Sequence, residues 1–251
     1  MGEGCERPMP AAFAPLPPPP SLKGRGSILL LPLSRPVPVA ACMTPISRRG
    51  LCLVLAAPSG AGKSAIATAL VTSEQYLRLS VSVTTRAPRA GETDGVHYHF
   101  QTQEAFDRLV SENGLLEWAR VLGRHCYGTP RAPVEAALAA GRDMVFDIDW
   151  QGHRQLRAAL PEDVVGVFIL PPDMATLEAR LRARAGDDEA EIARRMRLAH
   201  DEISHWAEFD HVVVNDDLPN AIEAVRAVLH AARTATARQT GAAAFVRRLA
   251  G

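Results

Sequence analysis

The stretch APSGAGKS combines residue types that bind phosphate groups. Gly60 and Gly62 allow backbone N–H groups to turn inward around an anion, and a helix beginning at Lys63 adds the positive end of its dipole. Lys63 would reach the β- and γ-phosphates of a nucleotide, and the Ser64 hydroxyl would bind Mg²⁺. Ala57 replaces the first glycine of the G-x-x-x-x-G-K-[ST] pattern, which a backbone with negative φ tolerates. A tight glycine turn between a strand and a helix is the alternative interpretation.

Two carboxylates, Asp147 and Asp149, end an apolar stretch that predicts a strand over 143–149. Residues two apart on a strand point to the same side, and ligands of parallel sheets bind at the carboxyl ends of the strands. A carboxylate there orders Mg²⁺ beside a phosphate loop, often through water. A pair of solvated carboxylates at a loop entry is the alternative.

A second set of cationic residues lies between the phosphate loop and this strand. Arg86 and Arg89 are three residues apart with Pro88 between them, so they can form a fork for one phosphate. Exposed loop arginines are usually only solvated, and the pair by itself therefore leaves that interpretation open.

Three further arginines, Arg180, Arg184 and Arg195, flank a stretch over 185–189 that contains Gly and Asp. Arg180 and Arg184 are four residues apart and share a helix face. A mobile loop that brings arginines onto a phosphate chain acts as a lid. Ordinary ion pairs on a helix surface are the alternative.

These residues need elements that position them. The apolar run over 51–56 is typical of a strand buried on both faces of a parallel sheet. Further strands are predicted over 77–85, 115–121, 143–149, 164–170 and 211–214, and helices over 63–72, 103–110, 129–140, 151–160, after Asp173 and after 214. Strands that alternate with helices predict an α/β fold with a parallel sheet. The polar segment over about 82–130 is predicted to be an insertion.

Composition excludes several classes of function. The hydrophobic content of 47% and charged content of 22% are those of an ordinary soluble globular protein. With 28 basic and 28 acidic residues, binding of nucleic acid through a general positive field is not expected. Cys5, Cys42, Cys52 and Cys126 form no C-x-x-C pair, which favours a reducing, cytoplasmic compartment and no cysteine metal site. There is no apolar run of about 18 residues, so no membrane span is expected.

The two ends of the chain differ from its middle. Residues 1–47 are proline-rich and without periodicity, which predicts disorder. A basic and apolar stretch before Cys42 loosely resembles a signal peptide with a lipid-attachment cysteine, but its prolines and late position argue against that function. A translation start at Met43 is the other interpretation. The tail over 236–251 is Ala-rich.

The motifs together resemble the guanylate kinase family, which transfers a phosphoryl group from ATP to GMP. The resemblance runs in order from about residue 48 to about 235 through APSGAGKS, SVSVTTRAPRAGETDGVHYHF, LLEWARV, YGTPRAPVE, VFDIDWQG and HVVVNDDL. Many families share the phosphate loop, whereas TTRxPRxGExxGxxYxF is far more specific. The resemblance implies a phosphate-loop NTPase core with three layers, an inserted α+β domain for GMP and a helical lid.

It also implies roles for individual residues. ATP would be bound by Ala57, Pro58, Ser59, Gly60, Ala61, Gly62, Lys63, Ser64 and Asn215. Mg²⁺ would be bound by Ser64 and, through water, by Asp147. GMP, and dGMP with it, would be bound by Ser82, Arg86, Arg89, Glu92, Tyr98, Glu117, Tyr127, Thr129 and Asp149. The catalytic residues would be Lys63, Arg180, Arg184 and Arg195.

The chemistry of guanine agrees with these residue types. Guanine offers N1–H and an amino group as donors and O6 as an acceptor. The carboxylate of Glu117 would take both donors, while the hydroxyl of Thr129 or Ser82 would donate to O6. AMP presents an acceptor at N1, so it would face the carboxylate badly. Small-molecule nucleotides are therefore the expected partners, and a homo-oligomer is left open.

The resemblance divides the chain into parts. The domain would span 48–235, with its core over 48–81, 137–179 and 208–235, the GMP-binding insert over 82–136 and the lid over 180–207. One departure is the segment VLGRHCYGT, which is one residue longer than the family pattern and carries Cys126 where a second tyrosine often stands. The extra residue is expected to bulge over 123–125.

Two rival functions follow from related proteins. A guanylate-kinase-like interaction module would bind peptides without catalysis, but such modules typically lose the phosphate loop or the lid arginines, which are intact here. A related kinase could act on another phosphorylated acceptor. Glu117 with Thr129 argues against that kinase, because the two side chains suit guanine.

Overall fold

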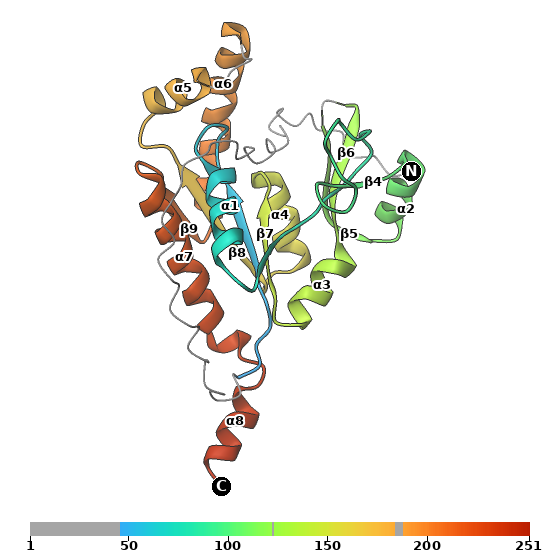
Figure 1. The fold of residues 1–251 in the computed structure, drawn as a ribbon, viewed down its shortest axis with the longest axis vertical. Helices are drawn as coiled ribbons and strands as arrows, with labels where there is room; N and C mark the ends of the chain where they lie inside the picture. Colours follow the sequence, from blue (N-terminus) through green and yellow to red (C-terminus); the bar gives the residue numbers. More distant parts are fainter. Residues whose placement is uncertain (1–45, 122, 184–187) are drawn as a thin grey trace, which may run out of the picture.

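A parallel sheet of five strands lies at the centre of the computed structural model, which describes residues 46–251 except 122 and 184–187 (Figure 1). The strands follow the order β2–β7–β1–β8–β9, with β1 in the middle. Their bounds are β1 Cys52–Ala56, β2 Leu77–Leu79, β7 Asp143–Asp147, β8 Val164–Leu170 and β9 His211–Val214. The predicted α/β fold with a parallel core sheet is confirmed.

Helices cover both faces of this sheet, in three layers. The first face carries α1 (Lys63–Ser73), α5 (Met174–Arg182) and α7 (Leu218–Thr234), and the second carries α3 (Arg131–Ala139) and α4 (Trp150–Ala159). Successive residues of β1 point to opposite faces, so Leu53 and Leu55 pack with the first set of helices and Val54 with the second. Both faces therefore require apolar residues, which explains why the sequence of β1 shows no alternation.

The inserted segment forms a second sheet, in the order β4–β3–β6–β5. Its elements are β3 Val83–Thr84, β4 His99–Phe100, α2 Gln103–Ser111, β5 Leu115–Val121 and β6 His125–Pro130. A small core of its own contains Phe106 and Cys126, with Trp118 packed edge-on against Phe106 at 6.2 Å. Figure 1 shows the insert to one side of the core sheet, joined to it next to α3 and α4.

Three predictions need correction. The strand predicted over 77–85 is two short strands, β2 in the core sheet and β3 in the insert, because the chain passes from one sheet to the other at that point. The strand predicted over 143–149 ends at Asp147. The helix predicted over 129–140 begins at Arg131, because Thr129 and Pro130 still belong to β6. The predictions for residues 1–45, including a start at Met43, lie outside the described residues.

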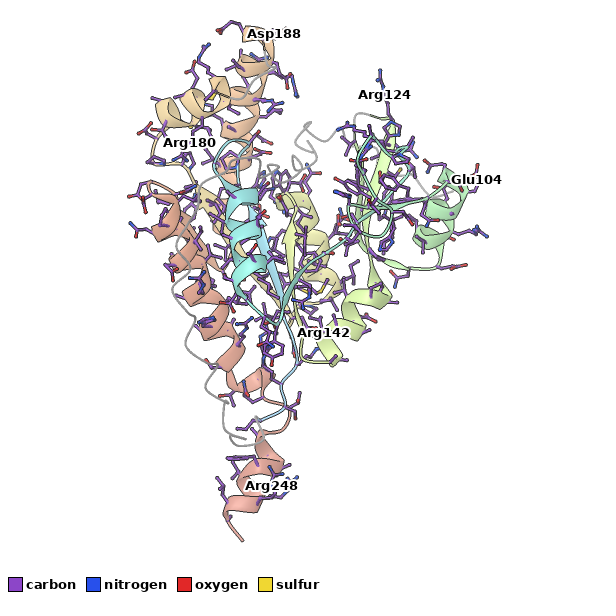
Figure 2. The ribbon with its side chains drawn as sticks, viewed as in Figure 1. Glu104, Arg124, Arg142, Arg180, Asp188 and Arg248 are labelled. Atoms are coloured by element: carbon purple, nitrogen blue, oxygen red, sulfur yellow. The ribbon has the colours of Figure 1, made fainter. Side chains whose placement is uncertain are left out.

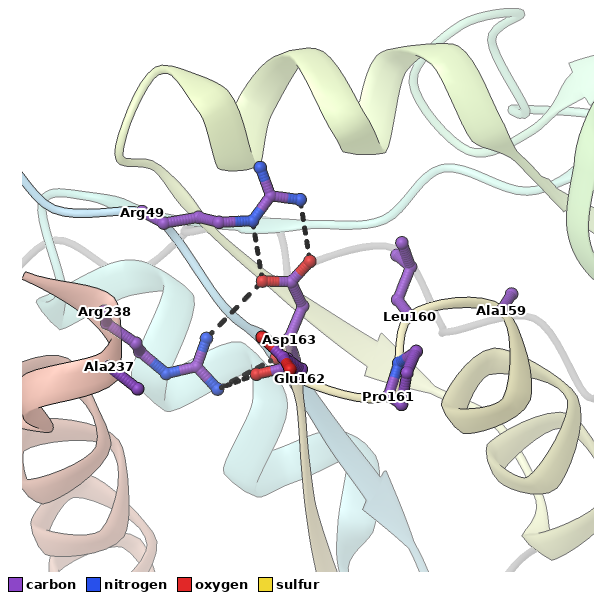
Figure 3. Close-up of a pocket in the computed structure, with 8 residues that line it drawn as sticks. All are labelled: Arg49, Ala159, Leu160, Pro161, Glu162, Asp163, Ala237 and Arg238. Atoms are coloured by element: carbon purple, nitrogen blue, oxygen red, sulfur yellow. Dashed lines mark hydrogen bonds and ion pairs between the residues drawn. The ribbon is translucent and has the colours of Figure 1, made fainter. Parts of the chain in front are cut away.

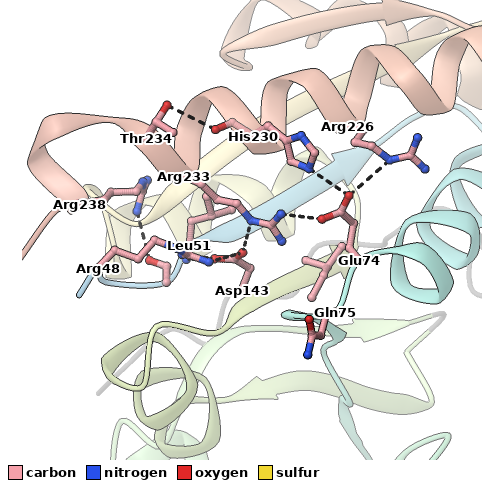
Figure 4. Close-up of polar contacts among 12 residues, drawn as sticks. Arg48, Leu51, Glu74, Gln75, Asp143, Arg226, His230, Arg233, Thr234 and Arg238 are labelled. Atoms are coloured by element: carbon pink, nitrogen blue, oxygen red, sulfur yellow. Dashed lines mark hydrogen bonds and ion pairs between the residues drawn. The ribbon is translucent and has the colours of Figure 1, made fainter. Parts of the chain in front are cut away.

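A network of buried charges ties α7 to the end of the sheet opposite the phosphate loop (Figure 4). Asp143 is fully buried and accepts from Arg48 at 2.7 Å and from Arg233 at 2.7 Å. Arg233 also donates to Glu74 at 2.6 Å, and His230 lies 3.0 Å from the same carboxylate. Because each carboxylate has several donors, this network fixes the C-terminal half of α7 against β7 and α1.

A small pocket at the same end of the sheet is lined by charged residues that bind one another (Figure 3). Arg49 donates two hydrogen bonds to Asp163, at 2.8 and 2.7 Å. Arg238 is buried and donates to the carbonyls of Gly50 and Glu162. These contacts fasten the 3₁₀ turn Thr236–Arg238, and the Ala-rich tail then continues as α8 (Ala242–Leu249).

The segment between β8 and β9 contains α5 and α6 (Glu189–Ser204), followed by the 3₁₀ turn Trp206–Glu208. The N-terminal end of α6 projects beyond the sheet, whereas its C-terminal end packs on the core through Ala199. Trp150 at the start of α4 stacks on His205 at 3.5 Å. In the part of the chain that the structure describes, no helix is long and apolar enough to cross a membrane.

Candidate active site

The phosphate loop joins the end of β1 to the start of α1. Gly60 and Gly62 have φ values of 95° and 98°, which favour glycine. A Cβ at Gly62 would lie 2.3 Å from Nδ2 of Asn215, so close packing also requires glycine there. Asn113 is the one non-glycine residue with positive φ among those described, so Ala57 has negative φ. The methyl group of Ala57 is therefore accommodated without backbone strain.

Lys63 and Ser64 both bind Asp147, at the end of the neighbouring strand β7. The Lys63 ammonium lies 2.8 Å from Oδ1 of Asp147, and the Ser64 hydroxyl donates to Oδ2 at 2.7 Å. Burial lowers the pKa of Lys63, but the charge and hydrogen bond of Asp147 outweigh this effect, so the net change is upward. The Lys63 side chain is therefore a fixed cation at the end of the phosphate loop, where α1 begins.

Asp149 lies two residues beyond the end of β7, so the prediction that it shares one strand with Asp147 is wrong. It is the N-cap of α4, and its carboxylate accepts from the N–H of Gly152 at 2.8 Å. Burial raises the pKa of Asp149, while the N–H of Gly152 and the charge of Lys63 act in the opposite direction. The cap therefore places this carboxylate close enough to Lys63 for their charges to interact.

Arg86 is held in the insert by a carboxylate and two rings. Its guanidinium donates to Glu92 at 2.8 Å and lies 5.4 Å from the centre of the Tyr98 ring and 5.8 Å from that of the Phe100 ring. The second oxygen of Glu92 accepts from the backbone N–H of Arg89 at 2.7 Å. The hydrogen bond from Arg86 lowers the pKa of the Glu92 carboxyl. Glu92 thus orients Arg86 and folds the loop that carries Arg89.

Tyr127 lies beside these residues although the hairpin before it carries an extra residue. Its ring packs edge-on against Tyr98 at 5.9 Å, and a hydrogen bond with its hydroxyl contributes to the raised pKa of Arg86. β5 and β6 pair regularly from Trp118 to Val121, which lies opposite His125. Gly123, in the segment between these two strands, has a φ of 64°, and the pairing of β5 with β6 places Tyr127 opposite Ala119.

Glu117 and Thr129 form a buried pair where β5 and β6 meet the core. The Thr129 hydroxyl donates to Oε1 of Glu117 at 2.6 Å, and the side chains are almost or wholly buried. Burial raises the pKa of Glu117 to about 7. A Cβ on Gly152 would lie 3.4 Å from Oε2 of Glu117, so the carboxylate lies against the first turn of α4. Ser82, also predicted to read guanine, is half-buried between β2 and β3.

The structure describes two of the three arginines predicted in the lid, Arg180 and Arg195. Figure 2 shows Arg180 near the start of α1, where it donates to the backbone carbonyl of Asn215 at 3.0 Å. Arg195 donates to Glu191 on the same helix at 2.9 Å. Arg184 lies outside the described residues.

Asn215 packs directly on the phosphate loop. It is 3% exposed, and its Nδ2 donates to the carbonyl of Ala61 at 2.7 Å. Its Oδ1, like Nη1 of Arg180, is buried and has no hydrogen-bond partner among the described residues. Two polar atoms next to the loop are therefore left without a partner among the described residues.

Sequence reasoning missed Glu202 on α6. Its side chain is 4% exposed and accepts a hydrogen bond from the backbone of the phosphate loop. Burial raises its pKa to about 7, against the charge of Lys63 and a hydrogen bond from the backbone N–H of Ser59. The available signal was its position two helical turns after Arg195, on the same face of the helix. The residue thus brings a carboxylate from the lid region to the loop.

Comparisons with known proteins agree with this geometry. The family model described as guanylate kinase matches residues 49–232. The chain is 65% identical over 197 residues to a guanylate kinase of Gluconobacter oxydans (strain 621H), with 78% of this chain and 94% of that protein covered. A guanylate kinase of Granulibacter bethesdensis is 63% identical over 192 residues, covering 76% of this chain and 89% of that protein. Among solved structures, a guanylate kinase from Anaplasma phagocytophilum superposes with a TM-score of 0.64 at 34% identity, covering 81% and 96% of the two chains.

Proposed function

The chain belongs to the guanylate kinase family and phosphorylates GMP with ATP, and we propose how its own residues divide this reaction between the two nucleotides. The supporting observation is that Asp149, the N-cap of α4, lies near enough to both Lys63 of the phosphate loop and the buried Glu117 for their charges to interact. The charge of Asp149 acts on Lys63 and also on Glu117. A donor nucleotide at the loop and an acceptor at Glu117 would therefore meet at the N-terminus of α4.

On the ATP side, the loop from Ala57 to Ser64 would bind the phosphates through its backbone N–H groups and Lys63. Asn215 would lie beside the adenine. Its unpaired Oδ1 is an acceptor, and the amino group of adenine is a donor. The unpaired Nη1 of Arg180 would donate to a phosphate oxygen.

Mg²⁺ fits the oxygen atoms next to Lys63. The Ser64 hydroxyl and the Asp147 carboxylate are hard oxygen ligands 2.7 Å apart, as this ion prefers. We propose that Ser64 binds the ion directly and Asp147 through water. When bound, the ion neutralises charge on the phosphate chain.

On the GMP side, Glu117 would accept from N1–H and the amino group of guanine, and O6 would accept from Ser82, or from Thr129 once its hydroxyl turns away from Glu117. This requires Glu117 to be ionised, and the guanine donors would add to the hydrogen bonds from Thr129 that already favour the ionised form. Since these contacts do not involve the ribose 2′-hydroxyl, dGMP should also be accepted.

The phosphate of GMP would be bound by Arg86, Arg89, Tyr98 and Tyr127. Arg86 is already oriented by Glu92, and a planar guanidinium can bind two phosphate oxygens. Glu92 would then act on the phosphate through Arg86.

The transfer itself requires positioning and charge neutralisation more than a strong base. Lys63 and Arg180 would neutralise the transferring group from the ATP side, and Asp149 would lie near the attacking oxygens of GMP. Arg184 and Arg195 are proposed to complete the set. Exclusion of water would protect ATP from hydrolysis.

The domain limits are part of the proposal. We assign the core to 48–81, 137–179 and 208–235, the GMP-binding insert to 82–136 and the lid to 180–207. The separate sheet and small core of the insert support this division. We also propose a cytoplasmic location and a role in recycling purine nucleotides, which phosphorylation of GMP would support.

A coupled assay for ADP with GMP, dGMP, AMP and UMP as acceptors tests these roles. We expect turnover of GMP and dGMP and a preference over AMP of about 10⁴ or more, as buried hydrogen-bonding sites provide. Turnover of AMP or UMP as fast as GMP would refute the guanine contacts. Loss of all turnover on adding EDTA, with recovery on adding Mg²⁺, is expected for the metal.

A further inference from the structure

The strand that carries Glu117 lies at the edge of its sheet and is held there by a side chain from the core. β5 pairs with β6 on one side only, because it is the last strand in the order β4–β3–β6–β5. On its other side, the amide of Gln155 bonds both backbone groups of Trp118. The Trp118 N–H donates to Oε1 at 3.1 Å, and Nε2 donates to the Trp118 carbonyl at 3.1 Å. Gln155 therefore takes the place that a neighbouring strand would occupy.

The hydrogen bonds between Gln155 and Trp118 also bear on the orientation of Glu117, the residue before Trp118. Backbone groups of successive residues in an antiparallel pair point alternately toward and away from the partner strand. Since those of Trp118 point to Gln155, those of Glu117 point to β6, where Glu117 lies opposite Thr129. The register between β5 and β6 shifts between Leu115 and Glu117, so β5 is not regularly paired with β6 in the residues just before Glu117. Gln155 contacts the strand one residue beyond this irregularity.

The helix that bears Gln155 also forms part of the site. Asp149 caps α4, Gly152 lies against the Glu117 carboxylate, and Gln155 follows Gly152 by three residues, on the same side of the helix. The helix α4 thus sets the position of the Asp149 carboxylate and also that of β5, the strand that carries Glu117.

We propose that Gln155 is a positioning residue for the guanine site: it fixes β5 to α4 and so fixes the distance from Glu117 to the reacting phosphates. The inference rests on the proposed contact between Glu117 and guanine. Gln155 is itself exposed, so its loss should change GMP binding much more than folding.

The test compares Gln155→Ala and Gln155→Glu with the wild type and with Gln103→Ala. Gln103 is the control, a half-buried glutamine on α2 of the insert whose amide donates to Asp107 at 2.8 Å. Gln155→Glu keeps the size and one acceptor but sets a carboxylate against the Trp118 carbonyl. The measurements are the Kd of GMP by calorimetry without ATP, the KM of each nucleotide, kcat and Tm.

We expect both Gln155 variants to raise the Kd and KM of GMP roughly 3- to 10-fold, the loss typical of one or two hydrogen bonds. The KM of ATP, Tm and the Gln103→Ala protein should stay at wild-type values. Unchanged GMP binding in Gln155→Ala, or an equal loss for ATP and GMP, would overturn the inference.

A double mutant separates this inference from the proposal beneath it. If Gln155 acts through Glu117, Gln155→Ala should add little to the loss already caused by Glu117→Ala. Fully additive losses would refute the coupling while leaving the guanine contact intact. Normal GMP binding by Glu117→Ala alone would refute the guanine contact, and the role of Gln155 with it.

Discussion

Replacing Glu117 by glutamine should make the free energy of unfolding, taken relative to that of the wild type, increase with pH. The same substitution should impair the use of GMP. Burial raises the pKa of this carboxyl from 4.5 to about 7. In the unfolded chain the Glu117 carboxyl ionises with a pKa of 4.5, whereas in the folded chain it stays protonated until about pH 7. At about 1.36 kcal/mol per pKa unit, the buried carboxylate therefore costs about 3 kcal/mol of stability above pH 7, and nothing below pH 4.5.

Glutamine is neutral throughout this range. It keeps an acceptor for the Thr129 hydroxyl, but its new N–H groups need partners, which adds a constant cost of about 1–3 kcal/mol. The informative quantity is the change with pH. The free energy of unfolding of Glu117→Gln minus that of the wild type should increase by about 2–3 kcal/mol between pH 5 and pH 8.

Urea unfolding of both proteins at pH 5 and pH 8 measures this difference. Other groups titrate alike in the two proteins and cancel to first order. A difference that does not change with pH would refute the reasoning, because the carboxylate would then ionise in the fold without cost.

The same residue links GMP binding to pH. Guanine needs the ionised carboxylate, so the Kd of GMP for the wild type should rise about tenfold for each pH unit below 7. Glu117→Gln should lose at least about 100-fold in kcat/KM for GMP and show a weaker pH dependence. An unaffected KM for GMP would show that another group reads the base.

Lys63→Ala should lower kcat at least about 10³-fold, because it removes a fixed cation from the phosphates, and residual turnover near the wild-type rate would contradict this role. Its folding, measured by Tm, should change little, since Asp147 regains access to water. Arg86→Ala should weaken binding of GMP about 100-fold by calorimetry but leave guanosine binding unchanged, because the phosphate is the one part of GMP that the arginine is proposed to contact; equal losses for both ligands would indicate a structural role. Glu202→Gln keeps an acceptor for the N–H of Ser59 and removes a negative charge near the phosphates, so the KM of ATP should fall about 3- to 10-fold at pH 8. Because burial raises the pKa of Glu202 to about 7, this benefit should disappear below pH 6, and a benefit equal at both pH values would argue against it.

Local patterns in the sequence determined most of the fold and the residue types of the site. The six apolar residues from Leu51 to Ala56 predict a strand covered on both faces, and β1 lies there in the middle of the sheet. The strands over 115–121, 164–170 and 211–214 were predicted with the bounds that the structure shows. Such features are readable because strand periodicity, glycine conformation and helix capping depend on residues a few positions apart.

Tertiary structure alone decided how those residues meet. No local pattern could show that Asn215 would pack on Ala61, 154 residues earlier, or that Gln155 would bind the strand of Glu117. The strand predicted over 77–85 was divided because its two halves find partners in different sheets. The raised pKa of Glu117 likewise depends on burial by distant segments. Sequence specifies which groups are present, but distances, burial and pairing between remote segments arise only when the chain has packed.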